Sequence, residues 1–246
     1  MTFPPSAPPL PDVTRVLGIF AHPDDVDFGS GGTVAKWVAD GLTVAYLIVT
    51  RGDSGGFDDT PRDQMPILRE AEQRAAAAKI GVTQVEFLDG YRDGYLTPTI
   101  ELRRDITRAI RRFRPDRILT NSPLRRWDRL AGPSHPDHLA VGEATTCAVY
   151  PDARNPFAFP ELLADEGLQP WVVREVWYSG GPNPDHVVDV TDTFDVKLAA
   201  LACHVTQTRH IDDLAGMLRS RMAQVARDAG LPEGRLAEAF TIIRTE

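Results

Sequence analysis

Short apolar segments alternate with helical segments along most of this chain, and the alternation limits the folds open to it. Residues 15–21 (RVLGIFA) and 43–50 (TVAYLIVT) have the composition of buried strands, with a helix predicted over residues 29–40 between them. Such a unit normally places its two strands side by side and parallel. Further strands are expected at residues 84–88, 116–120, 172–178 and 186–190, and helices at 67–80, 99–113, 135–150, 193–204 and 212–229. The sequence therefore predicts an α/β fold with a Rossmann-like, mostly parallel sheet and helices on both faces.

Composition favours a single domain. The chain has 246 residues, 42% of them hydrophobic, and no repeat or linker divides it, so we expect one domain over residues 13–246. Residues 1–12 are rich in proline and lack the features of a signal peptide, which predicts a flexible tail and a cytoplasmic location. No stretch approaches the ~20 apolar residues that would cross a membrane. The net charge of −8 argues against nucleic acid or an anionic membrane surface as the main partner.

Polar segments follow each of the first four predicted strands. In open α/β sheets, ligands bind beyond the carboxyl ends of the strands, where such segments meet. Topology alone therefore predicts that the four polar segments converge on one edge of the sheet. They are residues 22–28, 51–56, 89–95 and 134–138.

The first and last of these segments each contain a pair of potential metal ligands. Residues 21–25 read AHPDD and residues 134–138 read SHPDH. Catalytic zinc typically has three protein ligands and one open position, and histidine with carboxylate also suits iron or manganese. We predict that His22, Asp25 and His138 bind one ion.

The same two segments hold further groups for proton transfer. Asp24 would lie beside the ion without being needed to bind it, which suits a general base. His135 is a spare imidazole that would stabilise an oxyanion or protonate a leaving amine, and Asp137 is expected to orient its ring. Each segment also has an ordinary structural interpretation, because Ser134 and Asp137 fit a capping box, and Asp24 and Asp25 fit a turn. The occurrence of both clusters at one predicted sheet edge favours the metal site.

These segments resemble the LmbE-like/PIG-L family of zinc-dependent de-N-acetylases, over roughly residues 13–207. AHPDDVDFGSGGT resembles the family's first motif, and SHPDHLAVG resembles its H-x-D-H helix. The resemblance implies zinc bound by His22, Asp25 and His138, with Asp24 as the base and His135 as the catalytic imidazole.

The resemblance also implies substrate-binding residues. Residues 50–53 (TRGD) and 91–93 (YRD) are similar to family loops that contact substrate, which makes Arg51, Arg92 and Asp93 candidates. Residues 197–207 are similar to the family's C-terminal helix. Two departures leave the substrate open: Val26 replaces a frequent glutamate, with the acid moved to Asp27, and residues 132–133 (GP) stand where larger members have a tyrosine.

The predicted function is zinc-dependent removal of an acetyl group from an N-acetylglucosamine-type small-molecule conjugate, with Fe²⁺ as an alternative metal. Either Asp24 or His135 would protonate the amine. The alternatives are hydrolysis of a non-sugar amide or a phosphoester, and a zinc-binding sugar sensor without catalysis. A nucleotide-binding module is disfavoured because residues 29–32 (GSGG) do not have the dinucleotide-loop spacing. A homo-oligomer is possible, with the proline-rich residues 151–170 as a substrate rim or a subunit contact.

Overall fold

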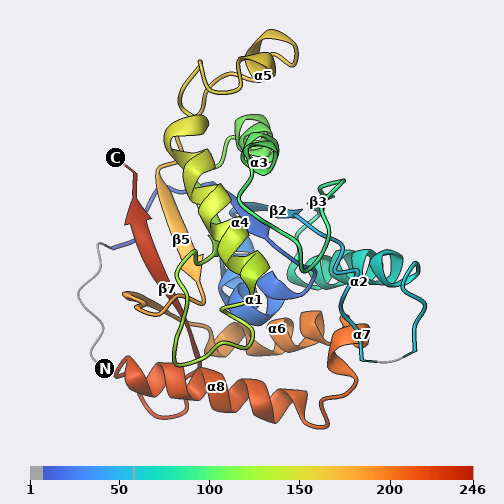
Figure 1. Cartoon of the computed structure of the whole chain (residues 1–246). Helices are drawn as coiled ribbons and strands as arrows, with labels where there is room; N and C mark the ends of the chain where they lie inside the picture. Colours follow the sequence, from blue (N-terminus) through green and yellow to red (C-terminus); the bar gives the residue numbers. More distant parts are fainter. Residues whose placement is uncertain (1–7, 58, 246) are drawn as a thin grey trace.

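The computed structural model describes residues 8–57 and 59–245 and contains one mixed, mostly parallel sheet between helices (Figure 1). Its strands are β1 (Arg15–Phe20), β2 (Thr43–Ile48), β3 (Gln84–Phe87), β4 (Arg117–Asn121), β5 (Glu175–Ser179), β6 (His186–Asp189) and β7 (Ala237–Arg244), in the order β3-β2-β1-β4-β5-β7-β6. The first five pair in parallel, whereas β7 is antiparallel to both β5 and β6. The predicted fold class is confirmed.

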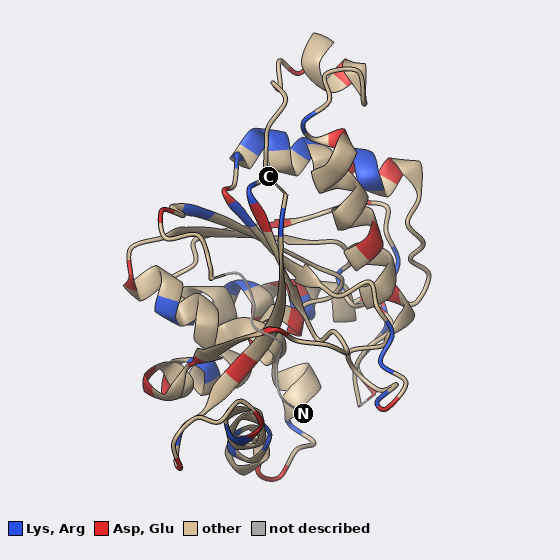
Figure 2. Ribbon diagram, turned by 90° about the vertical axis from the view of Figure 1, so that its left-hand side faces the viewer, with Lys and Arg blue, Asp and Glu red and all other residues tan. Residues whose placement is uncertain are grey.

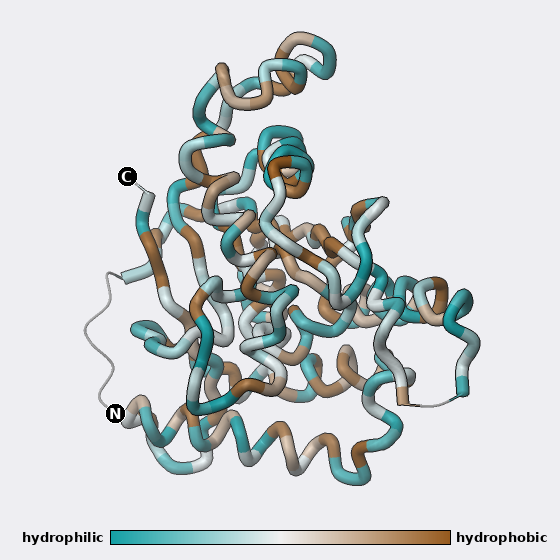
Figure 3. The backbone as a smooth tube through the Cα atoms, viewed as in Figure 1, coloured by the Kyte–Doolittle hydropathy of each residue, from teal (hydrophilic) through white to brown (hydrophobic). Residues whose placement is uncertain are grey.

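Alternate side chains of β1 enter two different hydrophobic cores. Leu17 and Ile19 pack with α3 and α4, whereas Val16 and Phe20 pack with α1, α2 and α6. A third cluster joins α8 to α6 as an outer layer. Hydrophobic segments accordingly concentrate in the central strands and the facing sides of the helices (Figure 3), and charged residues lie mostly on outer helices and loops (Figure 2). The helices are α1 (Asp25–Ala39), α2 (Met65–Ile80), α3 (Ile100–Phe113), α4 (Pro136–Cys147), α5 (Pro160–Ala164), α6 (Phe194–Leu201), α7 (Val205–Thr208) and α8 (Leu214–Asp228).

Several elements differ from the sequence prediction. The helix expected from residue 29 begins at Asp25, and the helix expected to reach residue 150 gives way after Cys147 to a π-type turn (Ala148–Asp152). The strand β7 and the short helices α5 and α7 were not predicted. Of the expected tail, residues 1–7 lie outside the described residues, while the backbone N–H of Leu10 donates to Glu175 at 3.1 Å.

The four polar segments do converge at the carboxyl edge of the sheet, as the topology predicted. The backbone N–H of Ser54, after β2, donates to the Asp93 carboxylate, after β3, at 3.2 Å. Asp93 in turn contacts His22, after β1, and His22 contacts Asp137, at the start of α4. Gly142 lets α4 come close to the end of β4, since a Cβ there would lie 2.5 Å from the carbonyl oxygen of Asn121. In the described part of the chain, no helix has the length and apolar character needed to cross a bilayer.

The opposite end of the sheet is closed by a buried ion pair. Arg117 donates to Glu175 at 2.5 Å, and both side chains are at most 4% exposed. The guanidinium lies over the rings of Trp37 and Trp177, 4.7 and 4.5 Å from their centroids. The indole N–H of Trp177 also donates to Glu175, at 3.1 Å. The ion pair and the two tryptophans therefore join the first residues of β4 and β5 to α1.

We expect Arg117→Met to lower the free energy of unfolding by about 3–5 kcal/mol, because Glu175 would remain buried without its cation. Urea denaturation followed by circular dichroism measures the change. The control is Arg112→Met, which removes the half-exposed pair with Glu86 and should cost about 1 kcal/mol or less. Equal losses in both variants would show that the buried pair has no special importance.

Candidate metal centre

A tight turn after β1 brings the first motif together. The carboxylate of Asp25 accepts from the backbone N–H of His22 at 2.9 Å, and Asp24 has a left-handed backbone with φ of 89°. Aspartate is among the residues that tolerate this conformation. Asp25 is then the first residue of α1, so its side chain is fixed both by the turn and by the helix.

The second motif forms the start of α4. Pro136 occupies the first turn, and His135 is the N-cap residue, with its Nδ1 accepting from the backbone N–H of Asp137 at 3.2 Å. The N-cap is therefore His135 and not Ser134, the residue of the capping box that the sequence offered. The cap directs His138, within the first turn of α4, toward the loop that carries His22.

Donor atoms of three residues from the two motifs meet at one point. Nδ1 of His22 lies 3.2 Å from Nε2 of His138. The Asp25 carboxylate reaches both rings with different oxygens: Oδ2 lies 3.5 Å from Nδ1 of His22, and Oδ1 lies 2.9 Å from Nε2 of His138. Ligands that bind zinc at about 2.0–2.2 Å in a tetrahedron are about 3.3–3.6 Å apart. The residues therefore fit a zinc ion with little rearrangement, and the same donors suit Fe²⁺. Atoms of His22, His135 and His138 also lie within 4.8 Å of one another.

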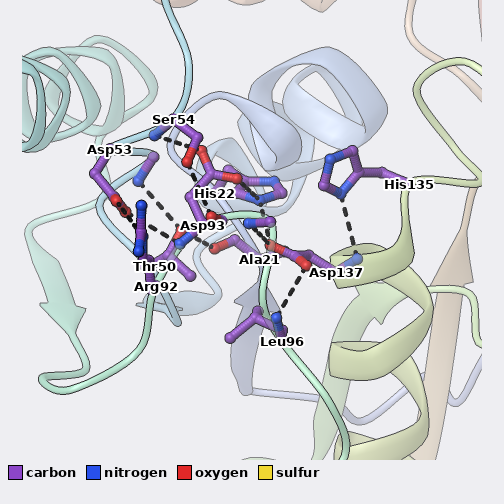
Figure 4. A network of polar contacts seen from close by, with 12 residues as sticks. Ala21, His22, Thr50, Asp53, Ser54, Arg92, Asp93, Leu96, His135 and Asp137 are labelled. Atoms are coloured by element: carbon purple, nitrogen blue, oxygen red, sulfur yellow. Dashed lines mark hydrogen bonds and ion pairs between the residues drawn. The ribbon is translucent and has the colours of Figure 1, made fainter. Parts of the chain in front are cut away.

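The other nitrogen of His22 faces two carboxylates (Figure 4). Its Nε2 lies 3.0 Å from Asp93 and 3.1 Å from Asp137. Burial alone would lower the pKa of His22, but hydrogen bonds with Asp137, Asp25 and Asp93 hold that pKa well above its usual value. With a proton on Nε2, Nδ1 is free to bind a metal, as is common for histidine ligands backed by a carboxylate.

The prediction that Asp137 orients His135 is wrong. The Asp137 carboxylate accepts from the backbone N–H groups of Gly94 and Leu96, at 2.6 and 3.1 Å, and contacts His22. Only the backbone of Asp137 contacts the ring of His135. That ring stands edge-on to His22, with centroids 5.0 Å apart, and is partly exposed. Asp137 therefore positions His22.

Asp24 is held from α2 by an arginine that sequence reasoning did not identify. Arg69 donates to the Asp24 carboxylate at 3.2 Å, to the carbonyl of Pro23 at 2.7 Å and to that of Gly52 at 3.0 Å. Gly52 has φ of 65°, and a Cβ there would collide with this guanidinium. Burial raises the pKa of Asp24, although Arg69 acts to lower it.

A second buried chain of contacts supports the turn from behind. Gln73 accepts from the backbone N–H of Asp24 and donates to Asp27, both at 2.8 Å. The same oxygen of Asp27 lies 2.8 Å from Nε2 of His204, and all three side chains are fully buried. His204 is thus a packed histidine that supports the turn. A possible sequence signal was the polar pair Arg69 and Gln73, four residues apart in an otherwise alanine-rich helix.

Of the three predicted substrate-binding residues, the structure brings only Asp93 to the donor cluster. Arg51 pairs with Glu70 and Asp89, at 2.8 and 2.9 Å. Arg92 is 67% exposed and lies over the ring of Tyr95.

Comparisons with known proteins identify the family to which the chain is similar. Residues 17–149 match the model of the PIG-L family, described as GlcNAc-PI de-N-acetylase. The chain is 34% identical to a diacetylchitobiose deacetylase of Thermococcus kodakarensis, over 81% of this chain and 72% of that protein. It is 29% identical to a 1D-myo-inositol 2-acetamido-2-deoxy-alpha-D-glucopyranoside deacetylase of Actinosynnema mirum, over 86% and 85%. Among solved structures, the N,N'-diacetylchitobiose deacetylase from Pyrococcus horikoshii superposes with a TM-score of 0.85 at 29% identity, covering 95% of this chain and 85% of that one.

We expect Gln73→Leu to lower the free energy of unfolding by about 2–4 kcal/mol, because the Asp24 N–H and an Asp27 oxygen would lose a partner in a buried site. Chemical denaturation measures the loss. The matched control is Gln224→Leu, which removes an exposed contact with Asp228 and should change stability by about 0.5 kcal/mol or less.

A paired exchange gives a sharper test of the same contacts. Gln73→Glu alone would place two carboxylates in contact, whereas Asp27→Asn alone would keep an oxygen for the Gln73 amide and remove only the charge. The double variant restores one donor and one acceptor, so we expect a favourable coupling of about 0.5–3 kcal/mol. Additive losses would exclude a direct interaction of the two side chains.

Proposed function

The chain belongs to the PIG-L family of GlcNAc-PI de-N-acetylases, and on that premise we propose that it is a zinc-dependent hydrolase that removes the acetyl group from an N-acetylglucosamine-type conjugate. Family membership makes it an amide-cleaving enzyme of the deacetylase type. The observation that carries the metal dependence is the meeting of His22, Asp25 and His138 donors at separations of 2.9–3.5 Å. Two relatives named for acetylated sugars support the substrate class.

In this proposal His22, Asp25 and His138 hold the ion. Zinc at such a site polarises a carbonyl and lowers the pKa of water to about 7, and Fe²⁺ is the alternative metal. Asp137 fixes the ring of His22. Two backbone N–H groups hold the Asp137 carboxylate, so the carboxylate cannot follow the His22 ring if the ring turns. Asp93 contacts the same ring through one carboxylate oxygen and accepts from Ser54 through the other, beside the place where a sugar would bind.

Asp24 is the general base that takes a proton from the attacking water. Its backbone is fixed by Gln73, its carboxylate is 14% exposed, and burial raises its pKa toward the range in which a carboxylate accepts protons efficiently. Arg69 aligns this carboxylate through one contact at 3.2 Å. That contact is neither short nor bidentate, so it does not neutralise the carboxylate.

His135 is the group that stabilises the developing oxyanion. Its partly exposed ring lies on the open side of the donor cluster, and preorganised donors of this kind commonly contribute about 10²–10³ in rate. The amine leaves after protonation by Asp24 or His135. Arg92 is exposed enough to reach a substrate, whereas the pairs of Arg51 with Glu70 and Asp89 favour a role in supporting the loop after β2.

We expect the purified protein to bind about one zinc ion per chain, and His138→Ala to lose most of that metal while keeping its fold. The reason is that two donors cannot replace a three-ligand site. Elemental analysis after dialysis gives the stoichiometry, and circular dichroism checks the fold. The control is His210→Ala, which removes a ring stacked on Phe57 outside the cluster. Unchanged zinc in the His138 variant would contradict the ligand assignment.

We expect Asp24→Asn to retain zinc but lower kcat by about 10²–10⁴, with little change in KM, because only proton transfer is removed. Acetate release from N,N'-diacetylchitobiose and from an N-acetylglucosaminyl inositol measures the effect. Asp89→Asn, at a side chain 89% exposed, serves as the control. Near-normal turnover in the Asp24 variant would remove it from the mechanism. If the zinc-loaded wild type released no acetate from either compound or from a panel of N-acetyl amines, a non-catalytic sugar-binding role would be favoured.

A further inference from the structure

The loop between β4 and α4 is closed at its base beside the metal site. The hydroxyl of Ser134 donates to the carbonyl of Arg126 at 3.1 Å and accepts from the N–H of Arg126 at 2.8 Å. Arg125 adds a bond from its guanidinium to the carbonyl of Ser134, at 3.0 Å. Ser134 directly precedes His135, so the position of this loop is tied to the catalytic imidazole. Residues 127–133 form the projecting part, which runs past α8 to the start of α4 (Figure 1).

The loop has an excess of positive charge that is unusual for this protein. Three arginines lie within residues 125–129, with Asp128 as the only acid among them, in a chain of net charge −8. Elsewhere the arginines of α3 are matched by carboxylates at 2.5–2.9 Å: Arg103 by Asp152, Arg108 by Glu166 and Arg112 by Glu86. In the loop, Arg126 already uses Asp128, at 2.6 Å. The remaining charge has no such counterpart.

Arg129 is the one arginine of this loop without a polar partner among the described residues. It forms no hydrogen bond or ion pair with any residue that the structure describes, and Asp128, the acid nearest in sequence, is occupied by Arg126. Burial lowers the pKa of Arg129, and the like charges of Arg221 on α8 and of Arg126 lower it further. Mutual repulsion of like charges is relieved when an anion binds among them.

An uncovered aromatic side chain accompanies these cations. Trp127 is 83% exposed, and Leu124 and Leu130 on the same loop are 58% and 57% exposed. Large apolar side chains gathered on one short loop indicate a contact surface. A ligand that carries both a ring with apolar faces and an anion would contact this surface well, because the ring would pack on the tryptophan and the anion would bind the arginines.

We propose that this loop is a subsite for a negatively charged group, a carboxylate or a phosphate, carried by the substrate outside its acetamido sugar. Arg129 binds the anion, and Trp127 packs against the part of the substrate that joins the anion to the sugar. Arginine is suited to this task because its fork of N–H groups matches the oxygens of either anion. The inference rests on the proposed deacetylase function and specifies which conjugates the enzyme prefers.

The test uses two glycosides of N-acetylglucosamine that differ by one charge, the butyl glycoside and the 3-carboxypropyl glycoside, each as both anomers. We expect the zinc-loaded wild type to show a kcat/KM for acetate release that is about tenfold or more higher with the carboxylate, mainly through KM. Arg129→Glu should abolish or reverse this preference and leave kcat/KM for the butyl compound within about twofold. The preference of the wild type should also weaken with added salt.

The matched control is Arg227→Glu, which makes the same change of charge on the exposed surface of α8, where Arg227 contacts only Gln224 among the described residues. It should keep the preference of the wild type. Equal rates for the two glycosides in the wild type, or equal effects of the two substitutions, would overturn the subsite while leaving the deacetylase function standing. If neither compound released acetate, titration calorimetry on the same variants would still decide the subsite, because tighter binding of the carboxylate that is lost only in Arg129→Glu supports it and equal binding overturns it.

Discussion

The turn that joins β1 to α1 is the constraint on which the site depends. In the proposed site this turn, four residues long, would place His22 and Asp25 on one ion and Asp24 beside them. The left-handed backbone of Asp24 makes this possible, and two side chains of α2 hold it in place: Arg69 from the carboxylate side and Gln73 through the peptide N–H. The helix α2 therefore holds the turn in its conformation, although α2 contributes none of the proposed metal ligands.

Charge balance gives an independent reason to expect a cation there. The carboxylates of Asp24, Asp25, Asp93 and Asp137 are all at most 14% exposed, and each contacts a histidine or Arg69. Buried carboxylates need compensating charge, and one arginine does not balance four of them. The raised pKa of His22 reflects the same deficit, since a second proton on the ring supplies part of the missing positive charge. A divalent ion bound at Nδ1 would take the place of that proton and bring more positive charge than the proton does.

Much of this arrangement could be predicted from sequence, because it depends on periodicity and topology. Parallel strands bring the segments after β1 and β4 to one edge, so the three donors could be named before any coordinates. The orientation of Asp137 could not, because it is decided by the backbone N–H groups of Gly94 and Leu96, forty residues away in an irregular loop. The roles of Gln73 and Arg69 could not be read from the sequence for a related reason: their spacing marks a polar pair on one helix, but their partners include backbone groups of a distant turn. The strand β7 was not predicted because it joins the sheet antiparallel, outside the alternation of strands and helices on which the prediction relied.

The site divides its tasks between different parts of the fold. Residues that would act on the acetamide come from the end of β1 and the start of α4, and they are buried and over-determined by hydrogen bonds. The loops after β2, β3 and β4 carry exposed side chains, among them Phe57, Tyr95 and Trp127. Such loops tolerate substitution because few contacts depend on them. The β4–α4 loop belongs to both parts, since it begins at the rim and ends at His135 through Ser134. A group bound at its tip would therefore lie on the same short segment as His135, the proposed catalytic imidazole, and recognition of the distant part of a substrate would set the position of the acetamide.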